Sequence, residues 1–109
     1  MIVRQEQLRI ELPLERIAEI CQEFGVTELS VFGSALRDDF RSDSDVDFLV
    51  VFDSPDLGPW MSRLSELQAE LSSLLRRPVD VALRSGVEQS ENYIRRRHIL
   101  RSAQAVYVA

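Results

Sequence analysis

Hydrophobic residues recur at two different spacings along the chain, and the alternation of these spacings predicts helices and strands in turn. Between Pro13 and Gly25 the spacing is three or four, which predicts a helix that begins at the proline and ends at the glycine. The residues on its apolar face are Leu14, Ile17, Cys21 and Phe24. Cys21 is therefore expected to be a buried core residue.

Three later segments are rich in β-branched and aromatic residues and predict strands. The first, "TELSVF" over residues 27–32, is followed by Gly33 and Ser34. The second covers residues 45–52, and its centre "FLVVF" is hydrophobic at successive positions, as in a strand that is covered on both faces. The third is "RRPVDVAL", with Pro78 near its start, where the missing N–H of proline is tolerated.

Helical spacing returns between and after these strands. A turn or two of helix is expected to begin at Ser34, and leucines at intervals of three and four predict an amphipathic helix through about residue 75. A last helix is predicted over residues 91–103, and "AVYV" near the C-terminus predicts a further strand. This order of elements indicates one small α/β or α+β domain over residues 1–109.

The composition narrows the classes of protein that the chain can belong to. Hydrophobic residues make up 45% and charged residues 28%, a balance typical of a globular domain. The single cysteine excludes an internal disulfide bond, and because all thirteen basic residues are arginine, chemistry that needs lysine is excluded as well. The net charge of −5 argues against direct binding to DNA.

The hydrophobic segments are too short to suggest a membrane protein. None approaches the ~18 consecutive apolar residues that a membrane-spanning helix needs, and the first residues lack the apolar centre of a signal peptide. We therefore expect a cytoplasmic protein without a membrane anchor.

Two aspartates at the start of the second predicted strand are unusual, because a hydrophobic strand rarely tolerates unpaired carboxylates. Asp45 and Asp47 are two residues apart and therefore project from the same face of the strand. Like charges this close destabilise a fold unless a cation lies between them, and oxygen ligands favour Mg²⁺ or Mn²⁺. Asp43, in the preceding loop, is more simply explained as the cap of a turn.

Asp80 supplies a third carboxylate, between hydrophobic neighbours in the third predicted strand. If that strand pairs with the second, the three aspartates can bind two metal ions and support phosphoryl or nucleotidyl transfer. The alternative is a salt bridge between Asp80 and an arginine, for which the candidates are Arg76, Arg77 and Arg84.

Gly33 and Ser34 end the first predicted strand and precede a segment that can start a helix. Glycine lets a ligand approach the backbone closely, and free N–H groups together with the serine hydroxyl form a site for the phosphates of a nucleotide. Arg37, close by in sequence, is a further candidate for contact with these phosphates.

The spacing of these residues resembles the signature of a known family. Gly33-Ser34, ten intervening residues and Asp45-Val46-Asp47 are similar to the motif of the minimal nucleotidyltransferases, a branch of the DNA polymerase β-like superfamily. The segments "RRPVDVALRSG" and "ENYIRRRHILRSAQAVY" also resemble family sequences. The resemblance implies a small mixed β-sheet flanked by helices, like the palm of polymerase β, with Mg²⁺ as the cofactor and ATP as the usual nucleotide substrate.

The same resemblance implies a role for each candidate residue. Gly33 and Ser34 would hold the triphosphate, and Asp45 and Asp47 would bind the metal. Asp80 matches the third acid, which in the family helps to activate the acceptor hydroxyl.

Family members of this kind are commonly antitoxins encoded beside a HEPN-domain toxin that cleaves RNA, and they resemble enzymes that attach AMP to a tyrosine of the toxin and so silence it. The resemblance thus implies a protein adenylyltransferase in complex with its toxin. Because 109 residues leave little room for an acceptor-binding domain, we expect a separate macromolecule as the acceptor rather than a small molecule such as an antibiotic. A different interpretation is an antitoxin that acts by binding alone, with its acidic face over a basic groove.

The remaining candidates lie near the C-terminus. His98, the only histidine, is expected on an exposed helix surface rather than as a catalytic base. The three arginines at 95–97 either contact an acidic partner or nucleotide phosphates, or form a solvated face. Tyr93 and Tyr107 are expected to be packing residues.

Overall fold

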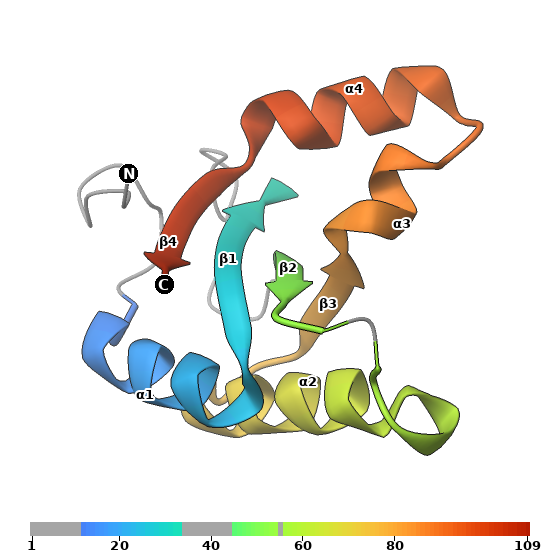
Figure 1. The fold of residues 1–109 in the computed structure, drawn as a ribbon. Coiled ribbons are helices and arrows are strands. Elements are labelled where there is room, and N and C mark those ends of the chain that lie inside the picture. The colour runs from blue at the N-terminus through green and yellow to red at the C-terminus, as the bar shows by residue number, and fades with distance from the viewer. Residues whose placement is uncertain (1–11, 34–44, 55) are drawn as a thin grey trace.

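Residues 12–33, 45–54 and 56–109 of the chain are described by a computed structural model. Within these ranges four strands form one mixed sheet: β1 (Val26–Phe32), β2 (Val46–Phe52), β3 (Val79–Leu83) and β4 (Gln104–Val108). Their order is β3-β2-β1-β4, with β2 and β3 parallel and β1 antiparallel to β2 and β4 (Figure 1). The predicted mixed sheet is confirmed, and the two strands that carry the aspartates are neighbours.

Two helices, α1 (Leu14–Phe24) and α2 (Ser62–Leu75), lie together against one face of the sheet (Figure 1). A single 3₁₀ turn, η3 (Pro59–Met61), leads into α2. The side chains between these helices and the sheet form the hydrophobic core, whose fully buried members include Ile17, Cys21, Phe48, Leu67 and Leu71. Both helices lie where the hydrophobic spacing predicts them, and Cys21 is buried as predicted.

Arg63, in the first turn of α2, joins this helix to the ends of α1 and β2. Its Nε donates to the Phe24 carbonyl at 2.7 Å, and its Nη2 lies 2.8 Å from the Asp53 carboxylate. The guanidinium also lies 5.0 Å from the centre of the Phe52 ring. The helix α1 ends beside this contact at Gly25, whose φ of 70° suits glycine in a C-terminal cap. One side chain thus fixes the relative position of three elements.

The other face of the sheet, here called the α3/α4 face, lies under α3 (Arg84–Glu88) and α4 (Tyr93–Ser102). Arg84 places its Nη1 3.3 Å from Glu28 Oε1 on β1, so the start of α3 is tied across β2. Asn92 caps α4 by accepting the Arg95 N–H at 3.1 Å. Ile99 is the buried residue of α4, and it lies outside the main core cluster.

These elements agree with the predicted order, with one addition. The last helix and the strand over "AVYV" are confirmed as α4 and β4, whereas the short helix α3 was not predicted. The helical turn predicted to begin at Ser34 lies outside the described residues.

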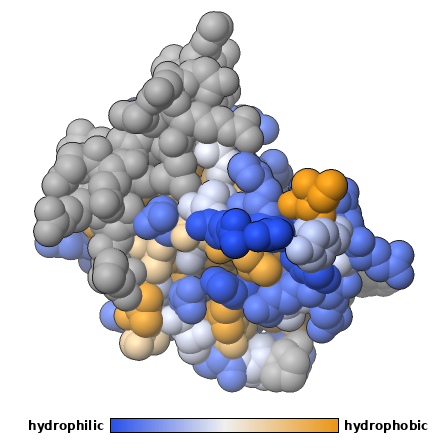
Figure 2. Space-filling view, turned by 90° about the horizontal axis from the view of Figure 1, so that it is seen from above, coloured by the Kyte–Doolittle hydropathy of each residue, from blue (hydrophilic) through white to orange (hydrophobic). Residues whose placement is uncertain are grey.

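Seen from the α4 side, the surface is mostly hydrophilic, with separate hydrophobic patches (Figure 2). The large hydrophobic side chains that are exposed include Tyr93 and Ile94 of α4. None of the helices in the described ranges is both long and apolar enough to cross a lipid bilayer.

Candidate active site

A row of three residues crosses the α3/α4 face of the sheet near the start of β2. Phe32 on β1 lies opposite Asp47, and Asp47 is in register with Asp80 on β3. Residues paired in this way point to the same face of a sheet, so the two carboxylates are neighbours. The next row on this face consists of Ser30, Leu49 and Ala82.

Gly33, directly after β1, brings the backbone against Asp47. Its φ is +76°, in the left-handed region that favours glycine, and a Cβ at this position would lie 2.8 Å from Asp47 Oδ2. The carboxylate therefore occupies the space that any other residue would fill with its side chain. This contact joins two parts of the predicted motif, the glycine and the second aspartate.

The other predicted site residues are only partly placed. Asp45 is exposed and directly precedes β2. Ser34 and Arg37 lie outside the described residues, as does Asp43.

The alternative explanation of Asp80 was a salt bridge with an arginine. Within the described ranges, which include Arg76, Arg77 and Arg84, Asp80 forms no salt bridge, and its side chain is exposed on an edge strand of the sheet. Arg84 instead pairs with Glu28 at 3.3 Å and with Glu88 at 3.7 Å. The position of Asp80 beside Asp47 is therefore not explained by an ion pair with these arginines.

Carboxylate oxygens are the ligands that Mg²⁺ prefers, so the residue types fit this ion. Over residues 12–33, 45–54 and 56–109, however, no group of three or more histidine, cysteine, aspartate or glutamate side chains is close enough to hold a metal ion. The register instead gives a pair, Asp47 and Asp80, whose like charges repel across neighbouring strands and would be stabilised by a cation. Metal binding by Asp45, Asp47 and Asp80 thus stays a prediction.

Comparison with known protein families identifies the family of this chain. Residues 14–104 match the model of the nucleotidyltransferase domain. The chain belongs to this family. The match runs from the start of α1 to the first residue of β4, and it includes the Gly33 turn and both strands that carry aspartates.

The nucleotidyltransferase is also similar to individual proteins. The protein adenylyltransferase MntA of Thermococcus cleftensis is 39% identical over 70 residues, which cover 64% of this chain and 68% of that protein. A solved minimal nucleotidyltransferase is 31% identical with a TM-score of 0.62, over 83% of this chain and 85% of that one. The complex of a tri-AMPylated HEPN toxin of Shewanella oneidensis with an MNT antitoxin shares the fold at 15% identity, with a TM-score of 0.51 over 88% and 70% of the two chains.

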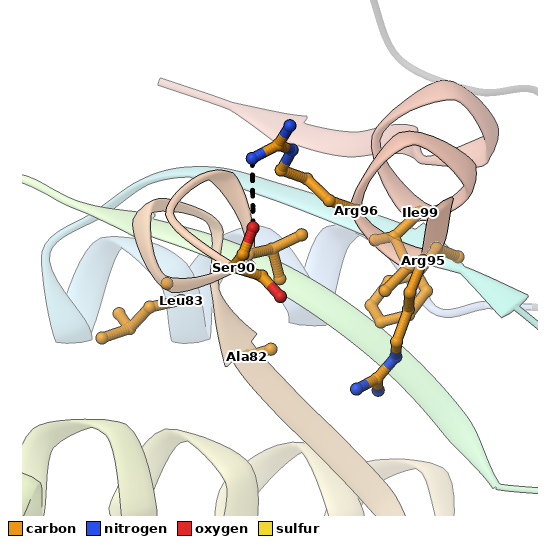
Figure 3. Close-up of a pocket in the computed structure, with 9 residues that line it drawn as sticks. Ala82, Leu83, Ser90, Arg95, Arg96 and Ile99 are labelled. Carbon is orange, nitrogen blue, oxygen red and sulfur yellow. Dashed lines mark hydrogen bonds between the residues drawn. The ribbon is translucent and has the colours of Figure 1, made fainter. Parts of the chain in front are cut away.

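A cavity of about 370 Å³ lies on the α3/α4 face of this nucleotidyltransferase (Figure 3). Arg95 and Arg96 line it together with Phe32 and Ala82 of the sheet. Arg97 lies elsewhere on α4, where its Nη1 lies 3.2 Å from the Tyr93 hydroxyl oxygen. The motif spacing does not predict this cavity, because its lining comes from β1, β3, α3 and α4. In the sequence, the run of three arginines at 95–97 pointed to this region. In the structure, two of them line the cavity and Arg97 does not.

The predictions for the C-terminal residues have mixed outcomes. His98 is exposed and Tyr107 is buried, as predicted. The prediction that Tyr93 is a packing residue is wrong, since 56% of it is exposed. Tyr93 is the first residue of α4, and the Arg96 guanidinium lies 5.4 Å from the centre of its ring.

Proposed function

We propose that this nucleotidyltransferase is an antitoxin that transfers AMP from ATP to a tyrosine hydroxyl of a partner HEPN ribonuclease toxin and thereby inactivates it. The observation that carries the proposal is the row in which Asp47 lies between the Gly33 turn and Asp80. A phosphate site and an acceptor site are needed on the two sides of the metal-binding carboxylates, and this row offers both. The similarity to a protein adenylyltransferase supports AMP as the transferred group.

The proposed roles are assigned residue by residue from the predicted motif. Gly33, Ser34 and Arg37 bind the triphosphate, and Asp45, Asp47 and Asp80 would hold Mg²⁺. When bound, Mg²⁺ would neutralise phosphate charge and polarise the reacting phosphate.

The proposed reaction forms one bond and breaks one. The tyrosine oxygen forms a bond to the α-phosphorus, the bond between the α- and β-phosphates breaks, and pyrophosphate leaves. Asp80 accepts the proton of the hydroxyl, which is the work of a general base. Asp47, held against Gly33, orients the nucleotide for this attack.

The proposed setting is the cytoplasm, in a hetero-oligomer with the toxin and without direct contact to DNA. The toxin partner is supported by the shared fold with the MNT antitoxin of a HEPN toxin complex. A partner protein brings its own surface, so the small domain needs no acceptor-binding domain of its own.

A direct test measures the intact mass of the toxin after co-expression with this protein. Wild type should add AMP-sized masses to the toxin, and treatment with a metal chelator should stop the transfer in vitro. Asp80→Asn should slow transfer by roughly 10²- to 10⁴-fold, as expected when a general base is removed. Glu66→Gln, which removes an exposed carboxylate on α2, is the matched control and should transfer normally.

An antitoxin that acts by binding alone gives a different result in the same experiment. The toxin would then stay unmodified, yet it would co-purify with wild type and with Asp80→Asn and would be inactive with both. That outcome would mean that the protein inhibits the toxin by covering it and does not transfer AMP to it.

A further inference from the structure

The cavity on the α3/α4 face is a formed site with a defined position relative to the carboxylates. It lies between α3, α4 and the sheet and has a volume of about 370 Å³, which is in the range of small-ligand pockets. Its apolar lining includes Leu83, Val87 and Ile99. Figure 3 shows these walls around the space, with Arg95 and Arg96 leaving α4 in different directions.

The strand register places the carboxylates beside residues that line this cavity, although neither Asp47 nor Asp80 is part of its lining. Ala82 lines it and lies two residues after Asp80 on the same face of β3. Phe32 also lines it and lies opposite Asp47. A ligand in the cavity that extends along the α3/α4 face past Phe32 or Ala82 would bring one end to the carboxylates.

The two arginines differ in what they already contact. Arg96 donates to the Ser90 carbonyl at 3.0 Å and lies over the Tyr93 ring, so its guanidinium already has two contacts within the α3–α4 region. The Arg95 guanidinium has no hydrogen bond or salt bridge with any residue in the described ranges, although its backbone N–H is used in the cap of α4. An apolar cavity with two guanidinium groups at its wall, of which Arg95 has no partner in the described ranges, suits an aromatic or aliphatic group that has a negative charge beside it.

We propose that this cavity is the acceptor subsite and that it holds a tyrosine ring whose sequence neighbours are acidic, with Arg95 as the residue that selects the acidic neighbours. The inference rests on the proposed function, which it deepens by naming the acceptor sequence. The ring fills the apolar space, its hydroxyl reaches Asp80, and a flanking carboxylate pairs with Arg95.

The position of the cavity favours the acceptor over the nucleotide. Most of its lining comes from β3, α3 and α4, whereas β1 contributes one lining residue, Phe32. The phosphate turn at Gly33 lies on the other side of Asp47, at the end of β1.

The polar groups of the cavity point the same way. An adenine ring both donates and accepts hydrogen bonds, whereas the arginine side chains only donate, and Ser90 already accepts from Asn92 and Arg96. A tyrosine ring leaves no such group unpaired in the apolar part, and its one hydroxyl extends towards Asp80.

The test uses two synthetic peptides as acceptors, each with one tyrosine, flanked by glutamates in the first and by lysines in the second. Arg95→Glu should raise the KM for the glutamate peptide about tenfold and lower it for the lysine peptide, because the charge interaction changes sign. The KM for ATP should stay unchanged. Arg101→Glu makes the same change on an exposed residue of α4 outside the cavity, and it should behave as wild type.

Ala82→Leu provides a second, independent variant that fills the cavity without changing charge. It should raise the KM for both peptides and leave the KM for ATP unaltered, which a general loss of folding would not do. A rise in the KM for ATP alone, in either variant, would assign the cavity to the nucleotide base and overturn the proposal. Equal behaviour of Arg95→Glu and Arg101→Glu would overturn it as well.

The toxin itself separates failure of this proposal from failure of the proposed function. Two results would overturn the acceptor subsite and leave the proposed function intact. In the first, wild type modifies the toxin but neither peptide. In the second, Arg95→Glu modifies the toxin and both peptides as wild type does. Wild type that transfers AMP neither to the toxin nor to the peptides removes both.

Discussion

At residue 33 the space that a side chain would need is already taken by the Asp47 carboxylate. A Cβ there would meet Asp47 Oδ2 at 2.8 Å, and the φ of +76° is one that other residues adopt only with strain. Glycine therefore does two things at this position: it permits the turn and it fixes the direction of a charged side chain. A residue without a side chain thus defines the geometry of the proposed site.

Cys21 is the residue whose environment shifts its titration most clearly. Burial raises the pKa of its thiol from 9.0 to about 12, so the folded protein keeps the proton at pH values at which the unfolded chain loses it. The resulting stability is complete below about pH 9 and is lost as the pH rises towards 12. At about pH 10 the free energy of unfolding should have fallen by about 1 kcal/mol through this group.

The measurement is urea unfolding at about pH 8 and about pH 10, for wild type and for Cys21→Ala. The variant is less stable at both pH values because it loses buried volume, but it should lack the additional alkaline decrease. An equal decrease in both proteins would show that the thiol does not titrate as its burial implies.

At the scale of elements, α1, α2, β1, β2 and β3 could be predicted from the sequence because each has a long or strongly hydrophobic repeat. The short helix α3 could not, since the five residues "RSGVE" contain a glycine and no helical repeat of hydrophobic residues. The pairing of β2 with β3 could be expected from the aspartates alone. The central place of β1 could not, because it depends on the pairing of β4, at the other end of the chain, with the second edge of β1.

The candidate site also has residues that the sequence could reveal and features that it could not. The glycine and the aspartates were found because their spacing along the sequence forms a motif. The cavity was not, and Arg95 could not be told apart from Arg96 and Arg97, because the cavity forms only when α3 and α4 are packed over the sheet. The exposure of Tyr93 was not predicted for a related reason, since helical spacing alone does not show which residues of a helix pack against the sheet.

Arg63 should be the most important single contact between elements outside the hydrophobic core. Replacing it in Arg63→Ala removes the hydrogen bond to the Phe24 carbonyl and the pair with Asp53, and should lower the free energy of unfolding by about 1–2 kcal/mol. The control is Arg16→Ala, whose ion pair with Glu19 is 3.8 Å long and largely exposed, and which should cost less than about 0.5 kcal/mol. Chemical denaturation measures both, and similar values for the two variants would contradict the role of Arg63.

On the scale of the whole molecule, the two faces of the sheet are unequally packed. The face under α1 and α2 contains the main core cluster, whereas α4 contributes Ile99 as its buried residue to the other face. Local opening needs less free energy where fewer hydrophobic contacts are broken. The wall that carries Arg95 is therefore the less stable part of the described structure.

Hydrogen exchange should reveal this difference directly. Backbone amides in α4 should exchange about tenfold faster or more than those at the centres of β1 and β2, because α4 can open while the core stays folded. Mass spectrometry of peptic fragments measures both sets in one experiment. Uniform protection across α4 and the sheet would mean that the helix opens only when the whole domain unfolds.

The parallel pairing of β2 with β3 determines which distant changes the protein can tolerate. Because parallel neighbours need a crossover, the chain between Asp47 and Asp80 passes through the whole of α2, whose Leu67 and Leu71 are fully buried. A substitution in α2 that changes how β3 packs beside β2 therefore alters the separation of the two carboxylates, although it touches neither of them. With the roles proposed for Asp47 and Asp80, such a variant stays folded and loses transfer.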